Sequence, residues 1–254
     1  MRVLAVEIYK EAFELYMKNL LLMLVSVLLT YLLAVVFLLV GFLFYFMLVA
    51  GGAALLADAR PLAMLAWLLG SLAFGAGTVL AVSAQGAFFG FARDAMEGSA
   101  RWDSALRWER RMWLTFAEIA VAQLVIYFII IMPAMLLAGS SISVLLIIMV
   151  PLLALASSVL QLAFSKAVTD FSGGMDSLAG GAMAALRNLR DFILLFIIGF
   201  GIALLGVVPL VGPFLSAPLN QTALLLFYRR TRERSQPVAK KVDEKVGSVA
   251  QGCG

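Results

Sequence analysis

Long apolar stretches separated by short charged segments constrain the fold of this chain more than any other feature. The first stretch covers residues 20–49 and contains no charged side chain. Over the whole chain 63% of residues are hydrophobic, only 13% are charged, and the mean hydropathy is +1.03. A soluble domain of this size could not cover so much apolar surface, whereas lipid solvates it. The composition therefore predicts an all-α, polytopic membrane helix bundle.

Six apolar segments could cross or enter a bilayer. They cover residues 20–49, 62–91, 113–137, 142–164, 192–208 and about 213–228. A hydrocarbon layer of about 30 Å needs about 20 helical residues. The last two segments are short and are broken by Pro209 and Pro213, so the 192–228 hairpin either crosses the layer or only enters it. We predict about six transmembrane spans.

The basic residues indicate how the spans are oriented. Eighteen of the 19 Lys and Arg residues fall in four segments on one side of this arrangement, and only Arg60 falls on the other. Short loops rich in Lys and Arg stay cytoplasmic during insertion. We expect a multi-pass protein of the plasma or inner membrane with both termini in the cytoplasm. Charge placed at a membrane face favours anionic lipid head groups as partners, and does not favour nucleic acid.

The chain divides into three regions. Residues 1–19 predict an amphipathic interfacial helix, because the charged and apolar residues fall on opposite faces. The charged face carries Glu7, Lys10, Glu11, Glu14 and Lys18, and the other carries Ile8, Tyr9, Ala12, Phe13 and Tyr16. This helix lies among the head groups or, alternatively, docks on the bundle. Residues 20–228 form the bundle. Residues 229–254 predict a basic, disordered cytoplasmic tail that anchors the last span or docks a partner protein.

A weak internal repeat lies within the bundle. The segment 91–104 aligns without gaps on 164–177, with Phe91/Phe164, Ser99/Ser172, Asp103/Asp176 and Ser104/Ser177 identical. Both copies lie on the predicted cytoplasmic side, which makes this a parallel repeat of 62–137 and 142–228. Asp103 and Asp176 stand where they could cap the helices that follow.

Aromatic and basic residues alternate after the first copy of the repeat. This pattern is typical of a helix at the lipid head groups, whereas nucleic-acid stacking is the alternative. The predicted interfacial anchors are Trp102, Trp108, Trp113, Arg107, Arg110 and Arg111.

A few polar residues lie inside the predicted spans, towards the cytoplasmic side. Glu118 is the only acid well inside a span, and it either pairs structurally or contacts an ion or substrate. The Asn220-Gln221 pair follows Pro218, so these amides either cross-link helices or face a substrate beside a broken helix. The candidate polar cavity comprises Gln85, Glu118, Gln123, Gln161, Asn220 and Gln221.

Catalytic and metal motifs are absent from the sequence. The chain has no histidine and only one cysteine, Cys253, and it has no Walker loop, CxxC pair, HExxH or nucleophile elbow. We therefore expect no enzyme activity, no cofactor and no metal site.

The C-terminal third has a recurring order of short motifs. These are Asp176-Ser177-Leu178, Ala185-Leu186-Arg187-Asn188, Pro209, Gly212-Pro213, Pro218 and Tyr228-Arg229. In this order residues 85–230 resemble the six-helix integral membrane proteins related to the membrane domain of some glycerophosphoryl diester phosphodiesterases. The resemblance implies a six-helix bundle with cytoplasmic termini and supplies no active site. The chain has no phosphodiesterase catalytic domain, so that activity is not implied.

These observations favour a non-enzymatic membrane module that organises lipid or a partner protein. The alternative is a small permease or channel with a cytoplasm-facing polar cavity. The two hypotheses differ in whether Glu118, Gln123, Asn220 and Gln221 converge on one cavity.

Overall fold

The computed structural model describes residues 4–55, 60–137, 142–205 and 212–251, and within these it contains helices and no strand. The elements are α1 (Leu4–Lys18), α2 (Leu20–Leu55), α3 (Arg60–Met96), α4 (Ser104–Leu137), α5 (Ile142–Asp170), α6 (Gly174–Arg187), α7 (Leu189–Leu205), a π-helical turn η1 (Gly212–Ser216) and α8 (Ala217–Gln251). The helical-bundle prediction is confirmed. The sequence also predicts a tight outer turn at Gly139-Ser140-Ser141, between the spans 113–137 and 142–164. This turn and Pro209 lie outside the described residues.

Four helices in the described ranges are long and apolar enough to cross a membrane. The candidate spans are Leu20–Val49, Met64–Met96, Ser104–Met132 and Met149–Asp170. α7 is also apolar but has only 17 residues, less than the roughly 20 that a full crossing needs. The structure is therefore compatible with a membrane protein that has at least these four spans.

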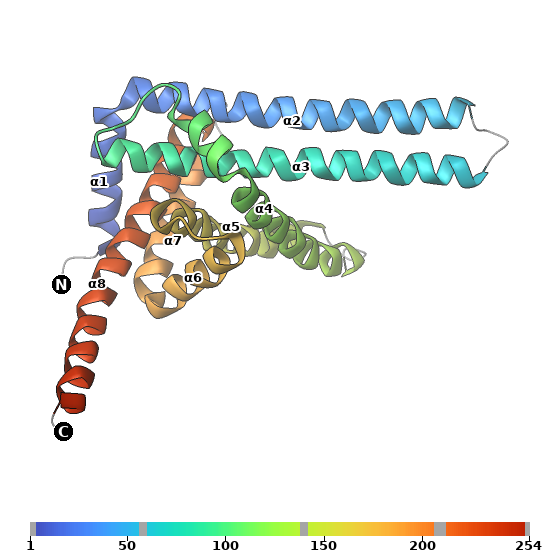
Figure 1. Cartoon of the computed structure of the whole chain (residues 1–254). Helices are drawn as coiled ribbons and strands as arrows, with labels where there is room; N and C mark the ends of the chain where they lie inside the picture. The colour runs from blue at the N-terminus through green and yellow to red at the C-terminus, as the bar shows by residue number, and fades with distance from the viewer. Residues whose placement is uncertain (1–3, 56–59, 138–141, 206–211, 252–254) are drawn as a thin grey trace.

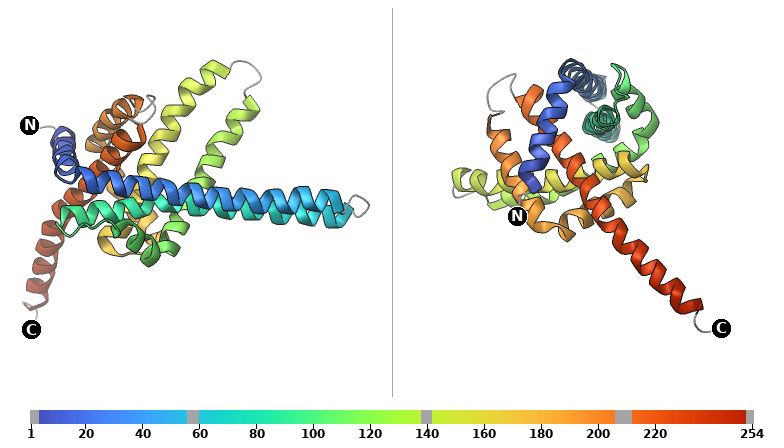
Figure 2. Two further views of the ribbon diagram at one scale, coloured as in Figure 1. Left: turned by 90° about the horizontal axis from the view of Figure 1, so that it is seen from above. Right: turned by 90° about the vertical axis from the view of Figure 1, so that its left-hand side faces the viewer.

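The helices are arranged as hairpins that diverge from one end of the molecule. α2 and α3 run side by side as a long hairpin. The N- and C-termini lie on the side of the molecule where α2 begins and α3 ends (Figure 1). α4 and α5 form a second hairpin that leans away from the first (Figure 2). Each outgoing helix is therefore followed by a helix that returns to the same end.

A backbone break precedes each outgoing helix at this end. Asn19 separates α1 from α2. Met112 interrupts α4 with φ −123° and ψ 19°, and Asn188 separates α6 from α7 with φ −122° and ψ 39°. Each unit of the fold thus consists of a short helix (α1, residues 104–111, or α6), an outgoing helix, and a returning helix. The predicted span start at residue 113 coincides with the break in α4.

The returning helices α3, α5 and α8 contact one another and carry the same spacing of residues. Each has a phenylalanine, a basic residue two positions later, and an acid four positions after that. The three sets are Phe91-Arg93-Glu97, Phe164-Lys166-Asp170 and Phe227-Arg229-Glu233. All three phenylalanine side chains are fully buried. The sequence repeat 91–104/164–177 includes the first two of these sets, and the third is visible once the helices are aligned in space.

The aligned repeat segments also share a local backbone feature. Gly98 has φ 70° and Phe171, the equivalent residue of the second copy, has φ 53°. Both fall in the left-handed region that ends a helix, and Phe171 is the one non-glycine residue there in the described chain. Ser104 and Ser177 are both fully buried after these turns.

α1 docks on the bundle through one face. Leu4, Ala5, Ile8, Tyr9, Ala12 and Tyr16 are buried, largely against α8 and α7, whereas Phe13 is exposed. The phenol of Tyr16 donates a 2.6 Å hydrogen bond to the carbonyl of Phe214 in η1. Docking of α1, which the sequence leaves as the alternative to a purely interfacial position, is thus present in the structure.

α8 extends further than the sequence suggests. The helix runs on to Gln251, whereas the predicted tail is disordered from residue 229. The stretch 229–245 contains seven Arg and Lys residues, which have high helix propensity. Low apolar content alone therefore did not distinguish a disordered segment from a polar helix.

The approach of α6 to α5 depends on Gly181. A Cβ atom at this position would lie 2.6 Å from the backbone N of Ala163, and backbone atoms of a packed helix cannot move aside cheaply. We expect Gly181→Ala to destabilise the protein by about 1–3 kcal/mol through overpacking. Thermal unfolding in detergent measures this. The control is Gly201→Ala, which has open space around it and should be neutral or stabilising by up to about 1 kcal/mol. Equal melting temperatures for the two variants would contradict the prediction.

Candidate functional site

Two adjoining cavities lie where the returning helices meet. The α7 cavity, of about 240 Å³, lies between α1, α5, α7 and α8, and the α2 cavity, of about 210 Å³, lies between α2, α3, α5 and α8. Gln161, Ala217 and Gln221 line both, so they form the wall that the two cavities share. The structure therefore brings together four of the six predicted cavity residues, namely Gln85, Gln161, Asn220 and Gln221.

The residues that line the two cavities are uncharged, and polar side chains stand among apolar ones. The α7 cavity adds Ser157, Ser158, Ser216 and Tyr9 to the amides, and the α2 cavity adds Thr30 and Tyr31. The lining contains no acid–base pair and no activated nucleophile, which acid–base or covalent catalysis would require. Such a lining can bind a ligand by hydrogen bonds.

The amides differ in how well their hydrogen bonds are satisfied. Gln161 donates to the hydroxyl of Ser157 at 3.2 Å. Asn220 donates to the carbonyl of Gly199 at 3.1 Å and accepts from the phenol of Tyr9 at 2.9 Å. In contrast, the buried Oε1 of Gln85 has no hydrogen-bond partner among the described residues, and Gln221 makes no side-chain hydrogen bond to them. Asn220 therefore cross-links α8 to α7 and α1, whereas Gln85 and Gln221 remain available.

The Tyr9 phenol is neutral and buried. The residue is 9% exposed, and this burial raises the pKa of Tyr9 above its usual value. A tyrosine phenol is already protonated at neutral pH, so Tyr9 is the donor in its hydrogen bond to Asn220. This contact places α1 at the wall of the α7 cavity.

Glu118 and Gln123 lie away from the cavities. The exposed Glu118 accepts a 2.9 Å hydrogen bond from the backbone N–H of Gly174, the first residue of α6. Gln123 is buried and donates to the hydroxyl of Tyr127, one turn along α4, at 2.8 Å. The predicted cavity residues thus fall into two groups, and only one of the groups forms a cavity.

The buried acid of α4 is Glu109, which the sequence reasoning did not select. Its side chain is 8% exposed and accepts a 3.0 Å hydrogen bond from Ser83 of α3, while its second oxygen has no partner among the described residues. The sequence could have indicated that Glu109 is buried, because helical spacing places it on one face with the apolar residues Ala105, Trp108 and Met112. All three of these residues are buried.

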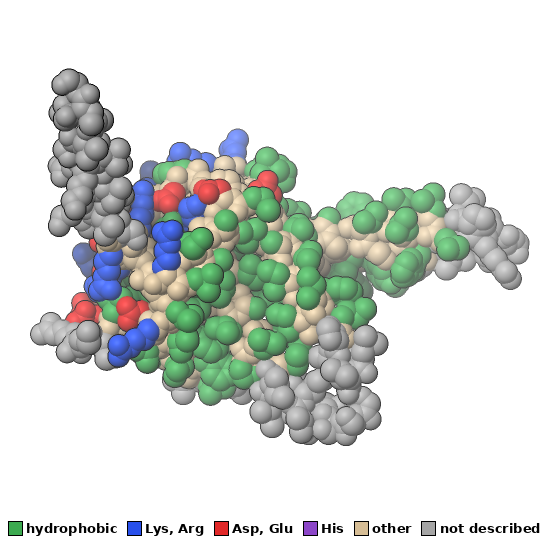
Figure 3. Space-filling view, turned by 90° about the horizontal axis from the view of Figure 1, so that it is seen from below, with side chains coloured by type: hydrophobic (Ala, Val, Ile, Leu, Met, Phe, Trp, Pro, Cys, Tyr) green, Lys and Arg blue, Asp and Glu red, His purple; other side chains and the backbone are tan. Residues whose placement is uncertain are grey.

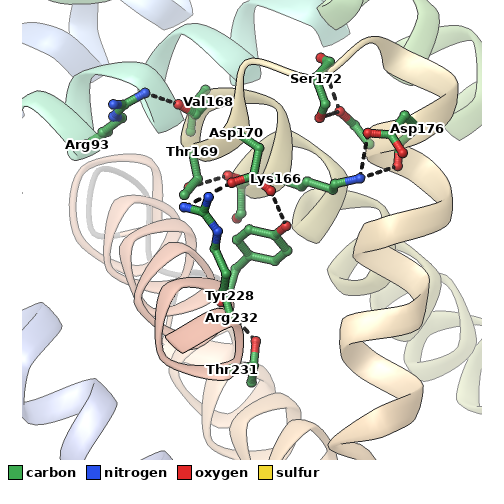
Figure 4. Close-up of polar contacts among 12 residues, drawn as sticks. Arg93, Lys166, Val168, Thr169, Asp170, Ser172, Asp176, Tyr228, Thr231 and Arg232 are labelled. Atoms are coloured by element: carbon green, nitrogen blue, oxygen red, sulfur yellow. Dashed lines mark hydrogen bonds and ion pairs between the residues drawn. The ribbon is translucent and has the colours of Figure 1, made fainter. Parts of the chain in front are cut away.

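Charged side chains gather at the end of the molecule where the short helices lie, and apolar side chains cover most of the rest of the visible surface (Figure 3). At this end Asp170 accepts a 2.8 Å hydrogen bond from Tyr228 and pairs with Arg232 at 3.1 Å (Figure 4). Arg230 pairs with Glu11 of α1. Ion pairs therefore connect α8 to α5 and to α1.

The predicted interfacial anchors occupy different positions at this end. Trp102 and Trp113 are exposed by 62% and 50%, and Arg107 and Arg110 are also exposed. Trp108 is buried, and its ring stacks on Phe171 at 5.6 Å while its indole N–H donates to Asp94. The guanidinium groups of Arg93 and Arg111 lie 4.5 and 4.6 Å from the Phe171 ring. Trp108 and Arg111 thus belong to an aromatic–arginine cluster in which Trp108 is buried and Arg111 and Phe171 are exposed.

No protein-family model, curated protein or solved structure matches this chain. Within the described ranges, no three His, Cys, Asp or Glu side chains lie together as a metal site would require. The resemblance to the six-helix membrane proteins stays a prediction.

Glu118 acts as the cap of α6, because the residue before the helix, Gly173, has no side chain to cap it. Removing the carboxylate by Glu118→Ala should destabilise the protein by about 1 kcal/mol, the usual cost of losing a helix cap. Glu118→Gln keeps an acceptor oxygen and should lose less. Thermal unfolding in detergent compares the two. A Gln variant as unstable as the Ala variant would show that charge, and not the cap, is what matters.

Proposed function

We propose that this protein is a non-enzymatic integral membrane module that organises lipid, or a partner protein, at the cytoplasmic face of the plasma or inner membrane. The observation that carries the proposal is the segregation of the surface into one charged end and apolar flanks (Figure 3). Exposed Trp102 and Trp113 stand beside exposed arginines at that end. Aromatic and basic residues together anchor proteins at head groups.

In the proposed arrangement the charged end faces the cytoplasm. The four candidate spans and the α7–α8 hairpin make about six crossings, and α1 lies at the head-group level against α8. The basic residues at this end attract anionic lipid, and the basic segment that begins at Arg229 docks a partner protein where one is present. No role in nucleic-acid binding is proposed.

A small permease is the second candidate, and the amide-lined cavities favour it. Glu118 and Gln123 do not line these cavities, so the cavities lack the ionisable side chain that the permease hypothesis included. The permease would therefore carry an uncharged solute.

The orientation is testable with the single native cysteine. We expect a membrane-impermeant maleimide to label Cys253 in inverted vesicles and not in intact cells, because the basic segments should stay in the cytoplasm. The matched variant carries Cys253→Ser and Ser140→Cys, which moves the thiol to a predicted outer turn. It should show the opposite pattern. Labelling of both thiols from the same side would contradict the proposed topology.

The lipid role is testable by measuring retained anionic lipid with native mass spectrometry. A basic residue near an anionic surface contributes about 1 kcal/mol, so Arg110→Gln should weaken the retention of phosphatidylglycerol about fivefold. Arg60→Gln removes the same charge from the predicted opposite side and should have little effect. A stoichiometric protein retained in place of lipid would favour the partner form of the proposal. Equal effects of the two substitutions would contradict a charged lipid-binding end.

A further inference from the structure

The cavities are built from equivalent positions of the three returning helices. Gln85, Ser158 and Gln221 each stand six residues before the buried phenylalanine of their helix, and all three line the cavities. Gln85 lines the α2 cavity, Ser158 lines the α7 cavity and Gln221 lines both, on three helices that contact one another. A side chain with hydrogen-bonding groups recurs at this position in each unit.

Two of these side chains have unused hydrogen-bonding capacity. The buried Oε1 of Gln85 has no partner among the described residues, and the Gln221 amide makes no side-chain hydrogen bond to them. An unsatisfied buried acceptor is costly, and a donor group bound in the α2 cavity would satisfy it. Amides both donate and accept, so this group carries hydroxyl or carbonyl oxygens.

Apolar residues lie beside the α2 cavity. The rings of Phe91, Phe164 and Phe227 are fully buried, and they are not among the residues that line either cavity. Each stands about 9 Å nearer the charged end than its polar partner, at a rise of about 1.5 Å per residue. The cavities therefore lie further from the charged end than these rings do. Tyr31, which lines the α2 cavity, is 42% exposed, and its neighbour Leu32 is 57% exposed, so lipid-compatible side chains lie beside this cavity.

The cavities are also too small for a whole lipid. Sites that enclose a drug-sized ligand usually measure about 300–1,000 Å³. Volumes of about 240 and 210 Å³ accommodate a polar group while its hydrocarbon chains remain outside. Because no charged residue lines either cavity, the polar group is uncharged.

We propose that the paired cavities bind the uncharged hydroxyl and ester groups of a neutral lipid, with the acyl chains lying along the apolar faces beside α2. Gln85 accepts from the lipid hydroxyl, and Gln221, in the shared wall, donates to an ester carbonyl. This inference deepens the proposed lipid-organising function, on which it rests, by naming a second lipid class and the site that takes it.

Titration of the purified full chain with dioleoylglycerol, followed by native mass spectrometry, tests the inference. Wild type should bind about one molecule, and Gln85→Leu and Gln221→Leu should each weaken binding about three- to tenfold, as expected for one hydrogen bond. Gln123→Leu is the matched control, because it changes the same amide within a span that lines neither cavity, and it should bind as wild type does. Ala34→Leu keeps every amide but fills part of the α2 cavity, and it should also weaken binding.

Two results would overturn the inference. One is equal binding of dioleoylglycerol by wild type, Gln85→Leu and Ala34→Leu. The other is a glycerol flux into proteoliposomes that wild type accelerates and Gln221→Leu abolishes, which would make the cavities a route for a water-soluble solute. The anionic-lipid measurement with Arg110→Gln is independent of these cavities. Failure of neutral-lipid binding therefore remains distinguishable from failure of the proposed function.

Discussion

Close packing of the three returning helices around their buried phenylalanines is the interaction on which the rest of the structure depends. Phe91, Phe164 and Phe227 are fully buried, and Phe164 stacks on Phe89 and meets the edge of Phe116. Small residues make room for these rings. A Cβ atom on Gly86 would lie 2.5 Å from the Phe116 ring. Apolar burial does not by itself hold helices together in lipid, so this close fit supplies the association.

The helices were predictable from the sequence, and the way they group was not. Apolar runs mark α2 to α5 because a spanning segment must be long, helical and free of charge. The break at Met112 follows from the change from a charged to an apolar pattern at residue 113. The third set of the Phe, basic, acid spacing escaped notice because α8 continues as a helix after Glu233, whereas α3 and α5 end in left-handed turns.

The distance of a polar residue from the end of its predicted span was a poor guide to the candidate site. This distance does not determine whether the residue lies on the buried face of the helix. Glu118 lies inside the predicted span 113–137 and Glu109 lies before it, yet Glu118 is exposed and Glu109 is buried. The grouping of Gln85, Gln161 and Gln221 required contacts between three helices far apart in the sequence. The equivalent positions of Gln85 and Gln221, each six residues before a buried phenylalanine, could have suggested part of this grouping, whereas Gln161 stands only three residues before Phe164.

α1 connects the charged end to the cavities, and the balance of its contacts indicates how. Arg230 and Glu11 are 33% and 44% exposed, and partly exposed ion pairs of this kind contribute only about 0–1 kcal/mol. The hydrogen bond from Tyr9 to Asn220 contributes about 1 kcal/mol more. Relative to exposure to water at the head-group level, burial of Ile8 alone contributes about 1.5–3 kcal/mol, and the buried rings of Tyr9 and Tyr16 add to it. Packing therefore holds α1 in place, while its polar contacts fix the register that brings a neutral phenol to the wall of the α7 cavity.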